Sequence, residues 1–107
     1  MAITELDTSN FDQLVLQAER PVLVDFWAAW CGPCRAMSPV MEEIAQVRKD
    51  IDVYKCNVDL VGTIARKYNI TSIPTRILFR DGKPTATIIS AEPKQSILAK
   101  LAKHLAY

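Results

Sequence analysis

Five segments of the chain have the length and composition of β-strands, and their hydrophobic pattern predicts how deeply each is buried. They are residues 3–6, 22–27, 51–58, 75–80 and 85–90. Residues 22–27, VLVDFW, are apolar on both faces except for one acid, as in a central strand covered by helices on each side. The last two strands are separated by Asp81, Gly82 and Lys83, so the sequence predicts an antiparallel hairpin there.

Four other segments repeat apolar residues every three or four positions, which is the period of a helix with one buried face. Pro39 lies inside the second of these segments and is expected to kink the helix. The predicted helices run from a cap at Thr8 or Ser9 to a point before Pro21, from the CGPC segment to near Asp50, over residues 60–68, and from Pro93 onward.

Strands and helices alternate along most of the chain, and a hairpin and a closing helix follow. Elements in this order, joined by short connections, are typical of the α/β class, with a mixed sheet of five strands flanked by four helices. No internal repeat, low-complexity tract or linker interrupts the 107 residues, so we expect a single domain over residues 1–107.

The composition narrows the class of protein chiefly by what it excludes. Thirteen Lys and Arg residues against 12 Asp and Glu residues give a net charge of +1 without a basic stripe, so neither nucleic acid nor a membrane surface is an expected partner. The apolar runs are too short to span a membrane and no basic leader is visible, which favours a soluble, cytoplasmic protein. Three cysteines are too few for a disulfide framework and indicate a reducing compartment with a reactive or metal-binding pair.

Two of the cysteines lie three residues apart in WCGPC, residues 30–34, directly after a predicted core strand. At this spacing in a helix the two Cβ atoms are about 5–6 Å apart, close to what a disulfide needs, so the bond can open and close with little backbone movement. At a helix N-terminus, free N–H groups and the helix dipole favour the thiolate of Cys31. Pro33 suits the first turn, and Gly32 lets a partner approach closely. The pattern indicates a thioredoxin-like redox motif with Cys31 as the better nucleophile.

Asp25 is the one acid in the predicted central strand. Burial raises the pKa of a carboxyl group unless a cation or hydrogen-bond donors offset the loss of water. Such a group is suited to proton transfer, and we expect Asp25 to accept the Cys34 proton through a water when Cys34 attacks a mixed disulfide. Lys55, on the next core strand, is the candidate counter-charge.

Several separated stretches resemble the thioredoxin family and occur in the family's order. They are VLVDFWAAWCGPCRAMSPVMEEIA, VYKCNVD, YNITSIPTRILFRDGK and the amphipathic C-terminal helix, which together span almost the whole chain. WCGPC with a downstream IPT is a highly specific signature of this family. The resemblance therefore implies the thioredoxin fold.

The resemblance also implies roles for individual residues. Cys31 would attack a substrate disulfide, and Cys34 would resolve the mixed disulfide. Asp25 and Lys55 would form the buried polar pair. Two residues would be structural neighbours of the site, namely Trp27 and Pro39.

The same resemblance implies how a substrate docks. In the family, the proline corresponding to Pro74 is cis and faces the cysteines, which leaves the backbone of Ile73 free to pair with an extended segment. The implied substrate surface consists of Trp30, Gly32, Pro33, Ile73, Pro74, Thr75 and Ser90.

The implied activity is the reduction of disulfide bonds in other proteins. A thioredoxin reductase, either NADPH- or ferredoxin-dependent, would restore the dithiol, and a monomer without bound cofactor or metal is expected. The Gly32-Pro33 pair resembles the reductants of the family, because more oxidising relatives place a histidine before the second cysteine.

Two positions depart from the family pattern. Ser90 stands where members usually have glycine, and Arg76 follows IPT where they usually have an uncharged residue. Both are expected to add bulk or charge near a docked partner. They would leave the dithiol chemistry intact and alter the preference for targets.

Other interpretations stay open on the sequence alone. CxxC also occurs in structural zinc sites, although the remaining candidate ligands, Cys56 and His104, are 48 residues apart. Asp25 could be a core carboxylate without a catalytic role, and Pro74 an ordinary trans proline. Cys56 is more typical of a small buried hydrophobe than of a regulatory thiol.

The activity itself has two alternatives. Thioredoxin-like domains also serve as redox-independent binding or scaffold subunits, and a Cys31→Ser, Cys34→Ser variant would keep that role while losing disulfide reduction. Others are oxidants or isomerases. The dithiol potential separates these from a reductant, since about 30 mV shifts a two-electron equilibrium tenfold.

Overall fold

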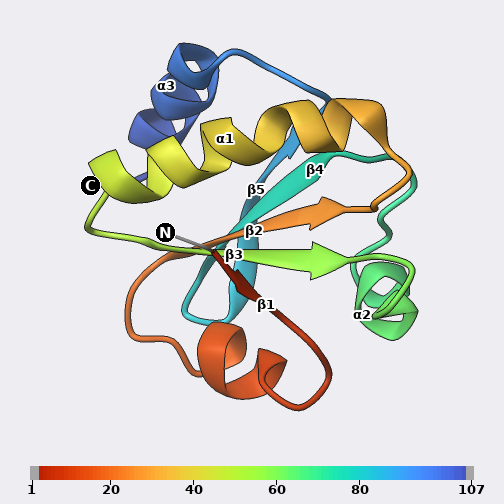
Figure 1. The fold of residues 1–107 in the computed structure, drawn as a ribbon. Helices are drawn as coiled ribbons and strands as arrows, with labels where there is room; N and C mark the ends of the chain where they lie inside the picture. The colour runs from red at the N-terminus through yellow and green to blue at the C-terminus, as the bar shows by residue number, and fades with distance from the viewer. Residues whose placement is uncertain (1–2, 106–107) are drawn as a thin grey trace.

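Five strands form one mixed sheet in the computed structural model, which describes residues 3–105 (Figure 1). They are β1 (Thr4–Glu5), β2 (Val22–Trp27), β3 (Asp52–Asn57), β4 (Thr75–Arg80) and β5 (Lys83–Ile89). The strand order is β1-β3-β2-β4-β5. β1 and β2 run parallel to β3, whereas β4 is antiparallel to both β2 and β5. The predicted α/β sheet of five strands is therefore confirmed, with β2 near its centre.

Helices cover both faces of this sheet. They are η1 (Asp12–Leu16), α1 (Gly32–Val47), α2 (Gly62–Lys67) and α3 (Lys94–Leu105). α1 and α3 lie on one face, and η1 lies on the other (Figure 1). The longest helix, α1, has 16 residues, and none of the helices within residues 3–105 is long and apolar enough to cross a membrane.

Alternation along β2 divides its side chains between two cores. Val22, Val24 and Phe26 belong to the core shared with η1 and α2, and Leu23 belongs to the core shared with α1 and α3. Successive side chains of a strand point to opposite faces. Asp25, two residues after Leu23, therefore points to the face that α1 covers.

The first helix differs from its prediction in its end and in its cap: η1 ends at Leu16, several residues before Pro21. Asp7, and neither Thr8 nor Ser9, caps the turn that leads into η1: its Oδ1 accepts the backbone N–H groups of Ser9 and Asn10 at 2.8 and 3.1 Å. The predicted buried face is nevertheless present, because Phe11 just before η1 and Val15 within it are both in the core. Periodicity locates the buried face of a helix, whereas its cap depends on which neighbouring side chain reaches the free N–H groups.

The helix that follows the cysteines is three residues shorter than predicted. α1 ends at Val47 instead of near Asp50, and Pro39 lies inside it as expected. The carbonyl groups of Lys49 and Ile51 accept hydrogen bonds from the Arg20 guanidinium at 2.5 and 2.9 Å. A side chain 29 positions earlier in the chain therefore holds the segment after the helix in a non-helical path.

The hairpin has a tighter turn than predicted. Lys83 already pairs with Arg80, so only Asp81 and Gly82 form the loop, and both have positive φ, 53° and 75°. This is the backbone of the two-residue turns that match the twist of a hairpin. β5 therefore starts two residues earlier than expected, and an irregularity beside Leu78 and Phe79 restores the register.

Candidate active site

The cysteine pair lies at the junction between β2 and α1. Cys31 is the N-cap residue of α1, with Pro33 in the first turn, and a disulfide joins Cys31 to Cys34 with their Cα atoms 5.2 Å apart. The backbone N–H of Cys34 donates a hydrogen bond to Cys31 Sγ at 3.2 Å. The first sulfur therefore occupies the place that a Ser or Asp oxygen takes in an ordinary N-cap.

Solvent exposure does not distinguish the two sulfurs. Cys31 is 4% exposed and Cys34 is 3% exposed. Their positions on the helix do differ, because only Cys31 Sγ receives an N–H group of the first turn. Negative charge is stabilised at that end of a helix, so the geometry favours a thiolate on Cys31 over one on Cys34.

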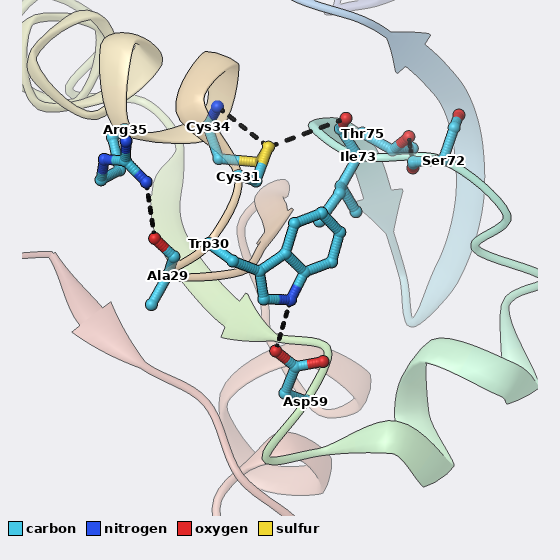
Figure 2. Close-up of a disulfide and its surroundings, with 9 residues drawn as sticks. All are labelled: Ala29, Trp30, Cys31, Cys34, Arg35, Asp59, Ser72, Ile73 and Thr75. Carbon is cyan, nitrogen blue, oxygen red and sulfur yellow. Dashed lines mark hydrogen bonds between the residues drawn. A yellow bond between two sulfur atoms is a disulfide. The ribbon is translucent and has the colours of Figure 1, made fainter.

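A shallow groove runs beside the disulfide. Trp30 is 68% exposed, and its Nε1 donates to Asp59 Oδ2 at 2.8 Å. Figure 2 shows the indole next to Ile73, whose carbonyl oxygen lies 3.9 Å from Cys31 Sγ. The groove has a volume of about 290 Å³ and is lined by Trp30, Val58, Ile70, Thr71, Ser72 and Ile73. It is large enough for a side chain of a docked polypeptide and too open to enclose a small molecule.

The loop before β4 faces the cysteines with a cis peptide bond between Ile73 and Pro74. The expected cis isomer is therefore present. The Ser90 N–H donates to the Pro74 carbonyl at 2.9 Å, which holds the end of β5 beside this loop. Thr75 is buried, and its hydroxyl donates to the Ser72 carbonyl at 2.6 Å. Its side chain thus holds the loop together instead of facing outward.

Asp25 lies in the core as predicted and is 1% exposed. Burial raises the pKa of its carboxyl group to about 7, although Arg76 and then Lys55 act to lower it. A carboxyl group with a pKa near 7 exchanges its proton easily at neutral pH. Asp25 thus has the protonation behaviour that a proton acceptor in this site would need.

Lys55 is not the main counter-charge of Asp25. It lies directly opposite Asp25 in the β2–β3 register, but its Nζ forms an ion pair with Glu5 Oε2 at 3.8 Å. The same Nζ lies 4.3 Å from the centre of the Trp27 ring. Of the two cations that lower the pKa of Asp25, Lys55 has the smaller effect.

The prediction that Arg76 adds charge to the docking surface is wrong. Arg76 is 0% exposed and lies opposite Asp25 in the β2–β4 register. The alternation of β4 turns its side chain toward the α1 face, together with Leu78. The family pattern located an unusual residue here, but it carried no information about the face on which its side chain lies.

The remaining residues predicted for the site differ in their location and solvent exposure. Gly32 and Pro33 are exposed beside the cysteines, and Pro39 is exposed further along α1. Trp27 is half-buried, with its Nε1 donating to Glu5 Oε1 at 3.3 Å.

Within residues 3–105 no three His, Cys, Asp or Glu side chains group closely enough to hold a metal ion.

Sequence reasoning missed two residues of the site. Asp59 accepts the hydrogen bond from the Trp30 ring although the two residues are 29 positions apart in the chain, so no local sequence pattern indicates this contact. The sequence did contain a signal for Arg76. It is a charged residue in a predicted strand, directly before the apolar residues ILF, just as Asp25 is a charged residue within VLVDFW. Two opposite charges in two apolar strands predict a buried pair if the strands are neighbours.

Comparisons with known proteins cover nearly the whole chain. A family model described as thioredoxin matches residues 2–103. The thioredoxin of Alicyclobacillus acidocaldarius subsp. acidocaldarius is 48% identical over 102 residues, which cover 94% of this chain and 96% of that protein. Thioredoxin 1 of Synechococcus elongatus is 48% identical over 98 residues, covering 91% of this chain and 92% of that protein. The chloroplastic M-type thioredoxin of Spinacia oleracea is 42% identical over 104 residues, which cover 96% of this chain and 58% of that protein.

Proposed function

The chain belongs to the thioredoxin family, and from this premise we propose that Cys31 is its attacking thiol and Cys34 its resolving thiol. The protein is a thiol–disulfide oxidoreductase that reduces disulfide bonds in other proteins. The observation that carries the assignment is the position of Cys31 at the N-cap of α1, where its Sγ receives the Cys34 N–H.

The reaction transfers two electrons in two exchanges of sulfur. The Cys31 thiolate attacks one sulfur of a substrate disulfide, and the other sulfur leaves as a thiolate. Cys34, once deprotonated, then attacks Cys31 Sγ in the mixed disulfide. The second substrate sulfur leaves, the substrate is fully reduced, and the Cys31–Cys34 disulfide remains. Because the pair is 5.2 Å apart between Cα atoms, this last bond forms without a large change of the backbone.

Asp25 is the proposed acceptor of the Cys34 proton, through a water molecule. Its burial and its pKa of about 7 support this role, because a base acts best when its pKa is near the working pH. Lys55 contributes a second, weaker positive charge on the neighbouring strand. Neither residue is proposed to touch the substrate.

The proposed docking surface surrounds the disulfide. Trp30 and Ile73 line the groove (Figure 2). The proposed surface also includes Gly32 and Pro33 in the first turn of α1, and Pro74 with its hydrogen-bonded neighbour Ser90. An extended substrate segment would pair with the backbone of Ile73 as an added strand. Thr75 supports this surface from within through its bond to Ser72.

Family members are themselves reduced by a thioredoxin reductase. For this chain we propose a donor that depends on NADPH or ferredoxin, and a monomeric, single-domain protein working in the cytoplasm. The free, buried thiol of Cys56 is compatible with a reducing compartment, where thiols are kept reduced. Sedimentation of the purified protein would test the monomer.

A trapping experiment tests the order of the two thiols. Cys34→Ser should stall as a covalent adduct between Cys31 and a model substrate such as reducible insulin, because no second thiol displaces the product. The adduct is measured by non-reducing electrophoresis and mass spectrometry. Cys31→Ser is the matched control and should accumulate far less adduct. Equal trapping by both variants would contradict the assignment.

A further inference from the structure

One row of side chains crosses the whole sheet at the level of Asp25. Glu5, Lys55, Asp25, Arg76 and Ile88 lie opposite one another in the registers of β1, β3, β2, β4 and β5. Directly paired residues point to the same face of a sheet. The row therefore lies on the face that α1 covers, and its charges alternate from Glu5 to Arg76.

Burial increases along this row toward Arg76. Glu5 is exposed and Lys55 is half-buried, whereas Asp25 and Arg76 are within the core. An electrostatic interaction is screened least where water is excluded. Arg76 is accordingly the charge with the largest effect on the pKa of Asp25, and Asp25 is the charge with the largest effect on the pKa of Arg76.

Several polar atoms of Asp25 and Arg76 are buried without a hydrogen-bond partner in the described part of the chain. Among residues 3–105, Asp25 Oδ1 and the Nε and Nη1 of Arg76 form no hydrogen bond and are inaccessible to solvent. A buried ionised group without compensation is costly, and a guanidinium stays protonated at neutral pH even though burial lowers the pKa of Arg76. Asp25 and Arg76 therefore act on each other as charges across the water-free core, and not through a hydrogen bond between these atoms.

The remaining nitrogen of Arg76 links the pair to the loop beside the disulfide. Arg76 Nη2 donates to the Ser90 carbonyl at 2.5 Å, and the Ser90 N–H donates to the Pro74 carbonyl at 2.9 Å. Ser90 has a φ of 74°, a conformation that residues other than glycine rarely adopt. Two bonds, one on each side of its backbone, hold Ser90 in this conformation.

We propose that Arg76 is a positioning residue of the dithiol site: its buried guanidinium is the principal counter-charge of Asp25 and also fixes Ser90 beside Pro74. The two departures from the family pattern, Arg76 and Ser90, then form one structural unit. The kinetic part of this inference rests on the proposed role of Asp25 as proton acceptor.

The charged groups around Asp25 determine the sign of the expected effect. Arg76 on β4 and Lys55 on β3 favour its ionised form, whereas Glu5 on β1 opposes it. Glu92, before α3, interacts with Arg76. Removal of Arg76 takes away the larger of the two favourable charges, so Asp25 should keep its proton to higher pH. The resolving thiol would then lack an ionised acceptor at neutral pH.

The test compares Arg76→Met with Lys55→Met, which removes the other cation by the same substitution. Carbon NMR of the Asp25 carboxyl group gives its titration midpoint directly. Arg76→Met should raise this midpoint by about 1 to 3 pH units, and Lys55→Met should raise it less. Arg80→Met is the control for loss of a charge on β4. Arg80 lies four residues after Arg76 on the same face of the strand, so its loss should leave the titration midpoint of Asp25 unchanged. A midpoint unchanged in Arg76→Met, or raised more in Lys55→Met, would overturn the proposal.

The kinetic readout separates this inference from the proposed function. Reduced protein is mixed with an aromatic disulfide whose thiol product is coloured, and release of the second thiol is followed from pH 5 to 9. Arg76→Met should shift the pH profile of this step upward, and Asp25→Asn should remove the Asp25-dependent part. If Asp25→Asn leaves the profile unchanged, the proposed proton acceptor is wrong, while the NMR midpoint still decides whether Arg76 is the counter-charge. If only Asp25→Asn has an effect, the inference about Arg76 is wrong.

The link to Ser90 has its own measurement. Loss of the guanidinium removes one of the two bonds that hold Ser90, so its amide should exchange with solvent about tenfold faster in Arg76→Met. An unchanged exchange rate would contradict the positioning role. Apolar replacements of buried charges are often tolerated. If this variant does not fold, Arg76→Lys provides the test: it retains the charge and should keep the Asp25 midpoint near that of the unaltered protein, and a large rise would overturn the proposal.

Discussion

At the scale of single residues, the three cysteines differ in what surrounds each sulfur. Cys31 Sγ lies at the N-cap of α1 and receives a backbone N–H, whereas Cys56 lies in the middle of β3 and is fully buried. Burial, with a smaller contribution from Glu5, raises the pKa of the Cys56 thiol to about 12. Cys56 is thus a small core residue, and its thiol is poorly suited to regulation by oxidation.

This contrast predicts a difference in alkylation. At pH 8 the native, reduced protein should react first at Cys31, while Cys56 should react about a thousandfold or more slowly than an exposed cysteine, because almost none of it is thiolate. Iodoacetamide labelling followed by peptide mass spectrometry measures both sites. The protein unfolded in urea is the control, in which Cys56 should label at the ordinary rate. Rapid labelling of native Cys56 would show that it is accessible.

At the scale of elements, the β4–β5 hairpin depends on a turn that only one residue type fits well. Gly82 has a φ of 75°, and a Cβ atom built on it would lie 2.6 Å from the carbonyl oxygen of Leu16, at the end of η1. The turn therefore packs directly against another segment of backbone. Neither the conformation nor the contact leaves room for a side chain.

Gly82→Ala should lower the free energy of unfolding by about 1–3 kcal/mol, because it combines a left-handed alanine with a backbone clash. Urea denaturation of the purified variant measures this change. Gly32→Ala is the matched control: the nearest atom to its added Cβ is the flexible end of Arg35 at 3.9 Å, so its stability should change little. Equal effects of the two substitutions would contradict the argument.

The elements themselves could be predicted well from local pattern. VLVDFW was predicted as a central strand and is β2 with the same bounds, because a strand buried on both faces needs apolar residues at every position. The predictions failed where distant segments decide the outcome. α1 ends earlier than predicted, where the distant side chain of Arg20 holds the segment that follows it. The hairpin turn has two residues instead of three, and it packs against the backbone of Leu16.

At the scale of the whole molecule, Asp25 makes stability depend on pH. In the unfolded chain its pKa is near 3.8, and in the folded protein it is about 7. Between these values the folded state holds a proton that the unfolded state has lost, so the free energy of unfolding falls as the pH rises through this window. The difference between the two pKa values corresponds to about 4 kcal/mol of the free energy of unfolding, and most of this contribution is lost by pH 7.

We therefore expect the protein to be more stable at pH 5 than at pH 8, and Asp25→Asn to remove most of this difference and to be the more stable form at pH 8. Urea denaturation of both proteins at pH 5 and at pH 8 measures these differences in the free energy of unfolding. Carboxyl groups whose pKa is lowered in the folded state, such as Asp7 and Asp50, act below this window and do not mask the effect. Asp59→Asn is the control and should keep the pH dependence. Higher stability at pH 8 than at pH 5 would contradict the burial of an ionisable Asp25.

Local patterns were sufficient for the strands, the helices and the position of Cys31 at a helix start, because each depends on residues close together in the chain. The family followed from several such local motifs in a fixed order, without knowledge of how they pack. Which charges meet in the core depended on the pairing of β2 with β4, two strands about 50 residues apart. That pairing placed Arg76 opposite Asp25 and joined it to Ser90, whereas the sequence had suggested Lys55 as the counter-charge and a surface position for Arg76. Strand register follows from the packing of whole faces, so no short segment contains the information that decides it.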